Sequence, residues 1–307
     1  MEAVIRKKSR GINSVSLLAE LGIHVVIGIF ALLCILPFIF VVIISFSSKA
    51  SIAARGYSFV PAEWSIQAYQ YAINLGAQLW RSYFNSFFTT AVGTALAVLI
   101  CILYSYALYR KDYPWRKFFM FFAFFTMIFG GGLVPTIMIC KNVLGLNDNY
   151  AALIVPLLVN PFNFVVMRTF FSTSIHESLI ESAAIEGSGE YRTLFSIVVP
   201  LAKPGIATIA LLNVLAYWNE WILAMLYIKN EKLIPLQYLL WRMQMNVDFL
   251  LRNSGIPGVD LSAALKNMPG QSLRMALCVF IVIPVAFAYP FFQRYIIAGL
   301  TIGAVKE

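Results

Sequence analysis

The chain has 307 residues, of which 60% are hydrophobic and 12% are charged. A soluble globular domain carries about 25% charged residues, so this chain has too little charge to cover a surface that faces water. The net charge of +9 does not indicate nucleic-acid binding, because the basic residues are scattered or flank apolar runs. In those places they set membrane orientation and contact anionic headgroups. Composition therefore predicts an integral membrane protein that contacts lipid and binds no nucleic acid.

Six apolar segments are each long enough to cross a bilayer, which requires about 20 helical residues. Backbone groups in lipid must bond internally, and these segments do not alternate polar and apolar residues, so they predict helices and not a β-barrel. We expect an all-α polytopic membrane protein with spans at residues 21–46, 84–108, 118–140, 150–171, 205–228 and 275–293.

Basic residues predict the orientation of these spans. Four of them precede the first span and four fill the short loop after the second: Arg6, Lys7, Lys8, Arg10, Arg110, Lys111, Arg116 and Lys117. Basic residues in short loops favour the cytoplasmic side. We therefore expect a cytoplasmic segment 1–20, a membrane domain 21–300 and a cytoplasmic tail 301–307. The long polar loop 229–274 then lies outside, either in contact with an external partner or as an inert lid.

An acidic segment at about 174–200 separates the fourth and fifth spans. Ser174 and Glu177 match a capping box, and Gly187-Ser188-Gly189 predicts a turn between two short helices. The segment is too polar to lie in lipid. It predicts a cytoplasmic helix-turn-helix that docks on another protein.

The third span contains Gly130-Gly-Gly-Leu-Val-Pro135 near its middle. Glycine and proline both weaken helices, and a broken helix persists in a membrane only where protein or water covers it. We expect a hinge or a site of close packing here, and both interpretations remain open.

The residues that would support catalysis or metal binding are missing. A nucleotide-binding loop needs Gly-Lys, a dipeptide that does not occur in this sequence. His176-Glu177 begins like a zinc-protease motif, but Ile180 occupies the place of its second histidine. The four cysteines lie in or at the ends of apolar segments without zinc-binding spacing. We expect no enzymatic activity, no metal site and no cofactor in this chain.

A polar group inside a span is a candidate for the path of a solute. Glu220 lies within the fifth expected span, where it either bonds to Asn219 or a nearby base, or lines such a path. Trp218 and Asn219 beside it are further candidates for this translocation path. Asn160 and Asn163 in the fourth span are candidates too, although bonding between helices explains them equally well.

One spacing pattern resembles a known motif. Glu181-Ser182-Ala183-Ala184-Ile-Glu186-Gly187, then nine residues and Ile197-Val-Val-Pro200, is similar to the EAA motif E-A-A-x-x-x-G-x9-I-x-L-P. That motif is typical of membrane subunits of binding-protein-dependent ABC importers. The departures are Ser182 for alanine, Glu186 where aspartate is common, and Val199 for leucine. Stretches along the rest of the chain resemble carbohydrate-uptake permeases of the LplC/YtcP-like and MalG-like type: 130–136, 144–152, 217–219 and 299–306.

The resemblance implies a type I ABC importer permease fold and a permease subunit in the bacterial cytoplasmic membrane. It implies ATP-driven, binding-protein-dependent import of oligosaccharides released from plant or algal polysaccharides. The implied partners are a second homologous permease in a heterodimer, two ATPase subunits that hold ATP and magnesium, and an extracytoplasmic solute-binding protein. The alternative is a stand-alone secondary carrier or channel, which predicts transport without an ATPase.

The resemblance also implies roles for single residues. Glu181 is expected to pair with a basic group of the ATPase, Ala183 and Ala184 to allow close approach, and Gly187 to make the turn. The loop 229–274 takes the place of a loop that probes the binding protein. The complete set expected to couple to the ATPase is Glu181, Ser182, Ala183, Ala184, Glu186, Gly187, Ile197 and Pro200.

Overall fold

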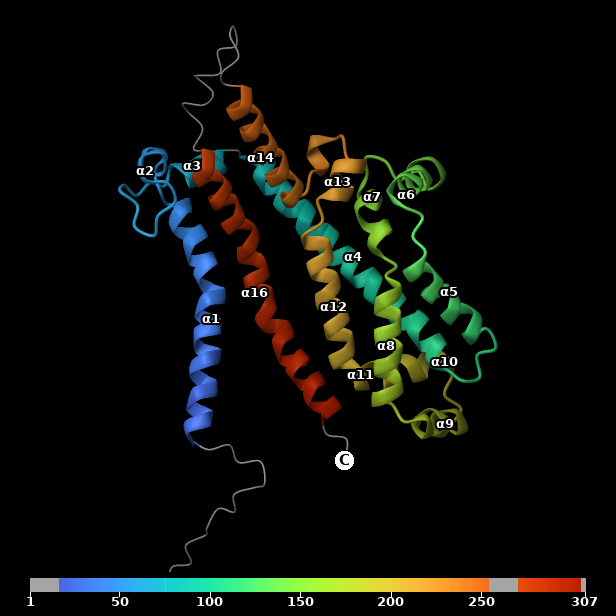
Figure 1. Ribbon diagram of the computed structural model, residues 1–307. Coiled ribbons are helices and arrows are strands. Elements are labelled where there is room, and N and C mark those ends of the chain that lie inside the picture. Colours follow the sequence, from blue (N-terminus) through green and yellow to red (C-terminus); the bar gives the residue numbers. More distant parts are fainter. Residues whose placement is uncertain (1–16, 75, 254–269, 305–307) are drawn as a thin grey trace, which may run out of the picture.

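The structure is a computed structural model that describes residues 17–74, 76–253 and 270–304 (Figure 1). Within these ranges every regular element is helical, apart from one isolated antiparallel bridge between Ser47 and Trp64. The expected all-α fold is therefore confirmed. Most of the expected cytoplasmic segment 1–20 lies outside the described residues, whereas residues 301–304 of the expected tail 301–307 continue the helix α16.

Among the described residues, three helices are long and apolar enough to cross a membrane without a break: α1 (Leu17–Ser45), α4 (Ala77–Tyr109) and α16 (Gly270–Ala304). The helix α1 begins four residues before the expected membrane domain 21–300, and α16 ends four residues after it. The helix α1 keeps most of its apolar side chains exposed and makes its main contact with α16. Its apolar surface therefore faces lipid or another protein.

The third and fourth expected spans are pairs of bent helices. In the third, α5 (Arg116–Ile128) meets α6 (Leu133–Met138) and the π-helix η1 (Ile139–Val143) at 117°. The break falls on the glycines at 130–132, and Gly132 has a φ of 82°, which favours glycine. A Cβ on Gly130 or Gly131 would contact nothing within 4 Å. Within the described residues, the break is therefore a bend and not a site of close packing.

In the fourth span, α7 (Tyr150–Ile154) with η2 (Val155–Leu157) meets α8 (Pro161–Ser174) at 51°. Pro156 and Pro161 explain this bend, since each lacks a backbone donor. The fifth span consists of α12 (Lys203–Trp218) and the short α13 (Ile222–Tyr227). The sequence predicted that Glu220 lies inside a helix, but the structure places it between two helices.

The helix ends gather at two ends of the bundle (Figure 1). The "α9 end" holds the start of α1, the junction of α4 and α5, the end of α16, and the elements α9 to α11 described below. The "α13 end" holds α13 and the following elements: α2 (Lys49–Arg55), α3 (Gln67–Asn74), α6, α7, η4 (Glu231–Leu233) and α14 (Leu236–Asn253). Between the ends, α4 packs against α8 and α12, and α16 packs against α1 and α12.

The polar segment 229–274, which the sequence predicted as a long loop, is helical over part of its length. Its helix α14 has 18 residues. Leu236, Leu239 and Leu240 are buried on one side of it, and this spacing of apolar residues anchors a helix by one face. Residues 254–269 of this segment lie outside the described part of the chain.

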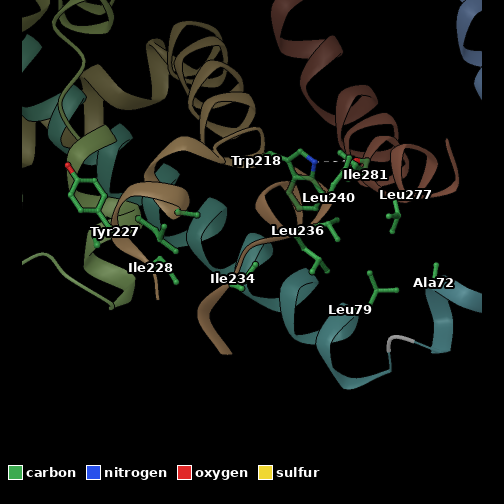
Figure 2. Packing of buried hydrophobic residues seen from close by; sticks show 14 of the residues in the cluster. Ala72, Leu79, Trp218, Tyr227, Ile228, Ile234, Leu236, Leu240, Leu277 and Ile281 are labelled. Atoms are coloured by element: carbon green, nitrogen blue, oxygen red, sulfur yellow. Dashed lines mark hydrogen bonds between the residues drawn. The ribbon is translucent and has the colours of Figure 1, made fainter. Parts of the chain in front are cut away.

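Two clusters of buried hydrophobic residues hold the bundle together. The first lies towards the α13 end, where Leu79, Tyr227, Leu236 and Leu277 are members (Figure 2). The second lies towards the α9 end and supports the acidic segment. Its members include Met167, Phe171, Ile180, Leu194 and Val198.

Gly93 lets α4 approach α12 closely. A Cβ at this position would lie 2.5 Å from the ring of Tyr217, and Tyr217 is fixed because its hydroxyl donates to the Ile154 carbonyl oxygen over 2.9 Å. Overpacking of this kind costs about 1–3 kcal/mol. We expect Gly93→Ala to lower the thermal midpoint of the purified protein by several degrees. Gly28→Ala is the matched control, because a Cβ there meets nothing within 4 Å; equal midpoints for the two variants would contradict the packing argument.

Candidate functional site

The acidic segment begins with α9 (Glu177–Ile185). The expected capping box is wrong, because Ser174 is still part of α8 and the Ile175 N–H bonds to the Phe171 carbonyl oxygen over 3.0 Å. The residue that precedes α9 is His176, which makes no side-chain cap. The Glu177 carboxylate is thus free for a longer-range contact, and it accepts a hydrogen bond from Lys111.

The end of α9 is fixed by Gly187. This glycine has a φ of 79°, in the left-handed region where a Cβ is unfavourable. The Gly187 N–H bonds to the Ala184 oxygen over 3.0 Å, and the Ser188 N–H bonds to the Ala183 oxygen over 2.9 Å. These two bonds form a Schellman motif, which satisfies the last carbonyl groups of a helix. The turn expected at Gly187 is present.

Most expected coupling residues on α9 face outward. Glu181, Ser182, Ala184 and Glu186 are exposed, whereas Ala183 is 5% exposed and packs into the bundle beside Ile180. The alanine available to another protein is therefore Ala184. The sequence interpretation also missed two apolar side chains near this surface, since Ile185 is 87% exposed and Tyr191 is 76% exposed. Ile185 occupies a variable position of the motif, so the motif gave no reason to select it.

The second half of the segment consists of three short helices: α10 (Glu190–Thr193), the π-helix η3 (Leu194–Val198) and α11 (Val199–Leu201). Leu194 and Val198 are buried and attach it to the bundle. Ile197 is half-buried and Pro200 is exposed. Proline is tolerated in the first turn of a helix, which is where Pro200 lies in α11.

Both halves of the acidic segment form hydrogen bonds or ion pairs with the last turn of α4 and the loop that follows it. We call these contacts the brace; its residues are Tyr106, Arg110, Lys111, Glu177 and Glu190. Lys111 pairs with Glu177, Arg110 pairs with Glu190 over 3.0 Å, and the Tyr106 hydroxyl donates to Glu190 over 2.7 Å. The bond to the Glu177 carboxylate raises the pKa of Lys111 above its usual value. The brace holds α9 and α10, on either side of the Gly187 turn, to one helix of the bundle.

A cavity of about 410 Å³ lies between α9 and the loop that follows α4. Its lining includes Glu181 of α9, Arg116 of α5 and Arg168 of α8. The Arg168 Nε atom is buried and has no hydrogen-bond partner among the described residues. The sequence interpretation overlooked Arg168, although an arginine inside an expected span is itself an indication of function.

The polar residues proposed for a translocation path are placed differently. Asn160 caps α8 by accepting a hydrogen bond from the Phe162 N–H over 3.1 Å. Asn163 is buried on α8, next to Phe164 of the cluster at the α9 end. Trp218 belongs to the other cluster, and its indole N–H donates to the Ile281 oxygen over 3.2 Å (Figure 2). The structure therefore does not bring these residues into one cluster.

Glu220 and Asn219 lie in the break between α12 and α13. The Glu220 carboxylate accepts a hydrogen bond from the Leu223 N–H over 2.8 Å, so it bonds to the first turn of α13 and not to Asn219. The Asn219 side chain donates to the Leu215 oxygen over 2.9 Å and accepts from Gln237 over 3.3 Å. Both side chains support local structure at the α13 end, and their place in a solute path remains a prediction.

Comparison with known proteins identifies the family. Residues 107–302 match the model of the family described as "Binding-protein-dependent transport system inner membrane component". The chain belongs to this family. The matched range contains the whole acidic segment and four of the expected spans, so the likeness covers the candidate site and most of the membrane domain.

The sequences of two relatives are similar to that of this permease over nearly its whole length. It is 37% identical to the polygalacturonan/rhamnogalacturonan transport system permease protein YtcP of Bacillus subtilis, over 90% of this chain and 94% of that protein. It is 35% identical to the protein LplC of the same organism, over 89% of each chain. A crystal structure of a bacterial ABC transporter involved in the import of the acidic polysaccharide alginate matches with a TM-score of 0.76 and 30% identity, covering 91% of this chain and 96% of that one.

These similarities confirm two predictions: the chain is an ABC importer permease, and it has the type I ABC importer permease fold. The permease is a multi-pass component of the inner membrane. Its family consists of transport subunits rather than enzymes. Family membership also implies, in general terms, that a second permease, an ATPase and a binding protein work with it.

Proposed function

We propose that this permease forms half of the translocation pathway of an ATP-driven importer of oligosaccharides. The relatives named for polygalacturonan, rhamnogalacturonan and alginate transport support a substrate class of polysaccharide fragments. The other half of the pathway is a second, homologous permease, so the membrane unit is a heterodimer. The exposed apolar surface of α1 offers contact area to that partner and to lipid.

The observation that carries this proposal is the exposed motif surface of α9, which is bonded to α4 through the brace. A side chain that is exposed in the isolated chain, on a segment too polar for lipid, is suited to contact with another protein. In the proposed complex Glu181 pairs with a basic group of the ATPase, and Ala184 allows the close approach. Two ATPase subunits hold ATP and magnesium. This chain contributes the surface on which they dock and through which their movement reaches the membrane helices.

The proposed orientation places the α9 end in the cytoplasm, where ATP is available. The basic residues at the junction of α4 and α5 lie at this end (Figure 1), as the positive-inside rule favours. Both termini are then cytoplasmic. The α13 end faces outward, towards the extracytoplasmic solute-binding protein, and the segment 229–274 is part of the surface that this protein meets.

Reconstitution tests the proposal. The permease is co-expressed with its partner permease and ATPase, placed in proteoliposomes, and supplied with binding protein and a labelled oligogalacturonide. We expect uptake that requires both ATP and the binding protein. Uptake that continues without either of them would support the alternative of a stand-alone carrier or channel and would contradict the proposal.

A further inference from the structure

Three aromatic side chains form a stacked group at the α13 end, away from the α9 surface. Trp221 immediately precedes α13, and Tyr238 and Trp241 lie one turn apart on α14. The Trp221 and Trp241 rings are 5.2 Å apart at an interplanar angle of 22°, and the Tyr238 and Trp241 rings are 5.8 Å apart at 20°. All three residues are partly exposed.

Polar residues flank these rings along the chain, and Arg242 also lies over one of them. The Arg242 guanidinium lies over the Tyr238 ring, 6.0 Å from its centre, and pairs with Glu231 over 3.3 Å. Gln237 donates to Asn219 over 3.3 Å at the same place. We call the three rings together with Arg242 the aromatic platform.

The Arg242–Glu231 pair is a weak one. The two side chains are 36% and 72% exposed, and an exposed ion pair adds little to stability. Arg242 is therefore able to exchange Glu231 for another carboxylate without a large loss of folding stability. A guanidinium binds carboxylates with two parallel hydrogen bonds, which gives both affinity and orientation.

We propose that the aromatic platform is a contact site for acidic sugar residues as they enter the translocation pathway. The C–H groups of a sugar ring pack against the accessible parts of the stacked rings, and the few polar groups at the edge fix its orientation, as is usual in small-molecule sites. Arg242 binds the carboxylate of a uronic acid residue. Asn219 and Gln237 supply amide groups for the sugar hydroxyls. This inference rests on the proposed function, since it places the platform on the outer side.

Two other roles for these aromatic residues are alternatives to sugar binding. Tryptophan and tyrosine also form belts at the membrane interface, but a belt does not require rings from two elements to stack on one another with an arginine over them. A binding-protein interface uses tryptophan, tyrosine and arginine as well. The guanidinium over the Tyr238 ring, whose glutamate partner is 72% exposed, is available to a sugar carboxylate.

Uptake by the reconstituted importer tests the platform. Trigalacturonate and the neutral galactotriose serve as probes, each at several concentrations. We expect Trp241→Ala to raise the half-saturating concentration of trigalacturonate about tenfold. We expect Arg242→Gln to do so for trigalacturonate and not for galactotriose. Trp80→Ala is the control, because Trp80 is 67% exposed on α4 at the same end and lies outside the platform.

Three outcomes would overturn the inference. The first is a Trp241→Ala variant with the same uptake kinetics as Trp80→Ala. The second is an Arg242→Gln variant whose uptake of trigalacturonate and of galactotriose is impaired to the same extent. The third is an increase in the concentration of binding protein needed to stimulate ATP hydrolysis, with sugar kinetics unchanged, which would make the platform a protein contact. Failure of the proposed function is distinct, since the unmodified importer would then show no ATP-dependent uptake. The thermal midpoint of each variant separates misfolding from a lost contact.

Discussion

Glu181→Lys is expected to abolish sugar uptake while leaving the permease in the membrane at its normal level. Glu181 is exposed on α9, and no ion pair within the described residues depends on it, so the fold does not need its charge. In the proposed complex the substitution sets two positive charges against each other, and like charges in an interface cost several kcal/mol. We expect uptake to fall by more than about a hundredfold, measured with labelled oligosaccharide in cells or proteoliposomes.

Glu20→Lys is the control for this variant. Glu20 is also an exposed acid at the α9 end, in the first turn of α1, and its substitution makes the same change in net charge. We expect it to keep most of its uptake. Normal uptake by Glu181→Lys would argue strongly against docking through α9, whereas equal loss in both variants would indicate a general effect of charge.

Glu190→Lys is expected to uncouple ATP hydrolysis from transport. Glu190 binds both Arg110 and Tyr106, and the Arg110 side chain is only 19% exposed. A lysine there repels Arg110 and leaves the Tyr106 hydroxyl without its acceptor, and each polar group left unsatisfied costs about 1–3 kcal/mol. Leu194 and Val198 still attach the segment to the bundle, but its polar link to α4 at α10 is lost, and we expect movement of the segment to reach α4 less effectively. We expect the amount of sugar imported per ATP hydrolysed to fall about tenfold or more.

The reciprocal exchange separates transmission from simple loss of stability. Arg110→Glu combined with Glu190→Lys restores an ion pair of opposite direction, and we expect it to recover a substantial part of the coupling ratio. Each single variant should keep its ATPase activity and its association with the ATPase. Equal coupling ratios in the single and double variants would show that the brace does not transmit the movement.

The sequence was sufficient for the features that depend on local pattern. Apolar run length located the long apolar helices and the bent helix pairs of the membrane domain, and the spacing from Glu181 to Pro200 located the acidic segment and its turn. Gly187 was recognisable because a positive φ after a short helix strongly favours glycine. These features depend on composition and near-neighbour geometry, which a single sequence contains.

Features that depend on tertiary contacts were not predictable in the same way. Ser174 matched a capping box, but continued helical hydrogen bonding kept it in α8. The partners of Glu177 and Glu190 lie 66 and 80 or more residues away, so no local pattern identified the brace. The polar segment after α13 formed α14 because buried leucines attach it to the bundle. Arg168 was a different case, since its position inside a span was visible in the sequence.

Photo-crosslinking from Ile185 shows whether α9 docks on the ATPase. Ile185 is 87% exposed at the end of α9, and Val143, at the opposite end of the bundle, is 74% exposed. A photoreactive amino acid in place of each residue is irradiated in the assembled importer, and the products are separated by mass and identified by mass spectrometry. If α9 docks on the ATPase, we expect a permease–ATPase adduct from position 185 and none from position 143. No ATPase adduct from position 185, or equal amounts from both positions, would contradict docking through α9.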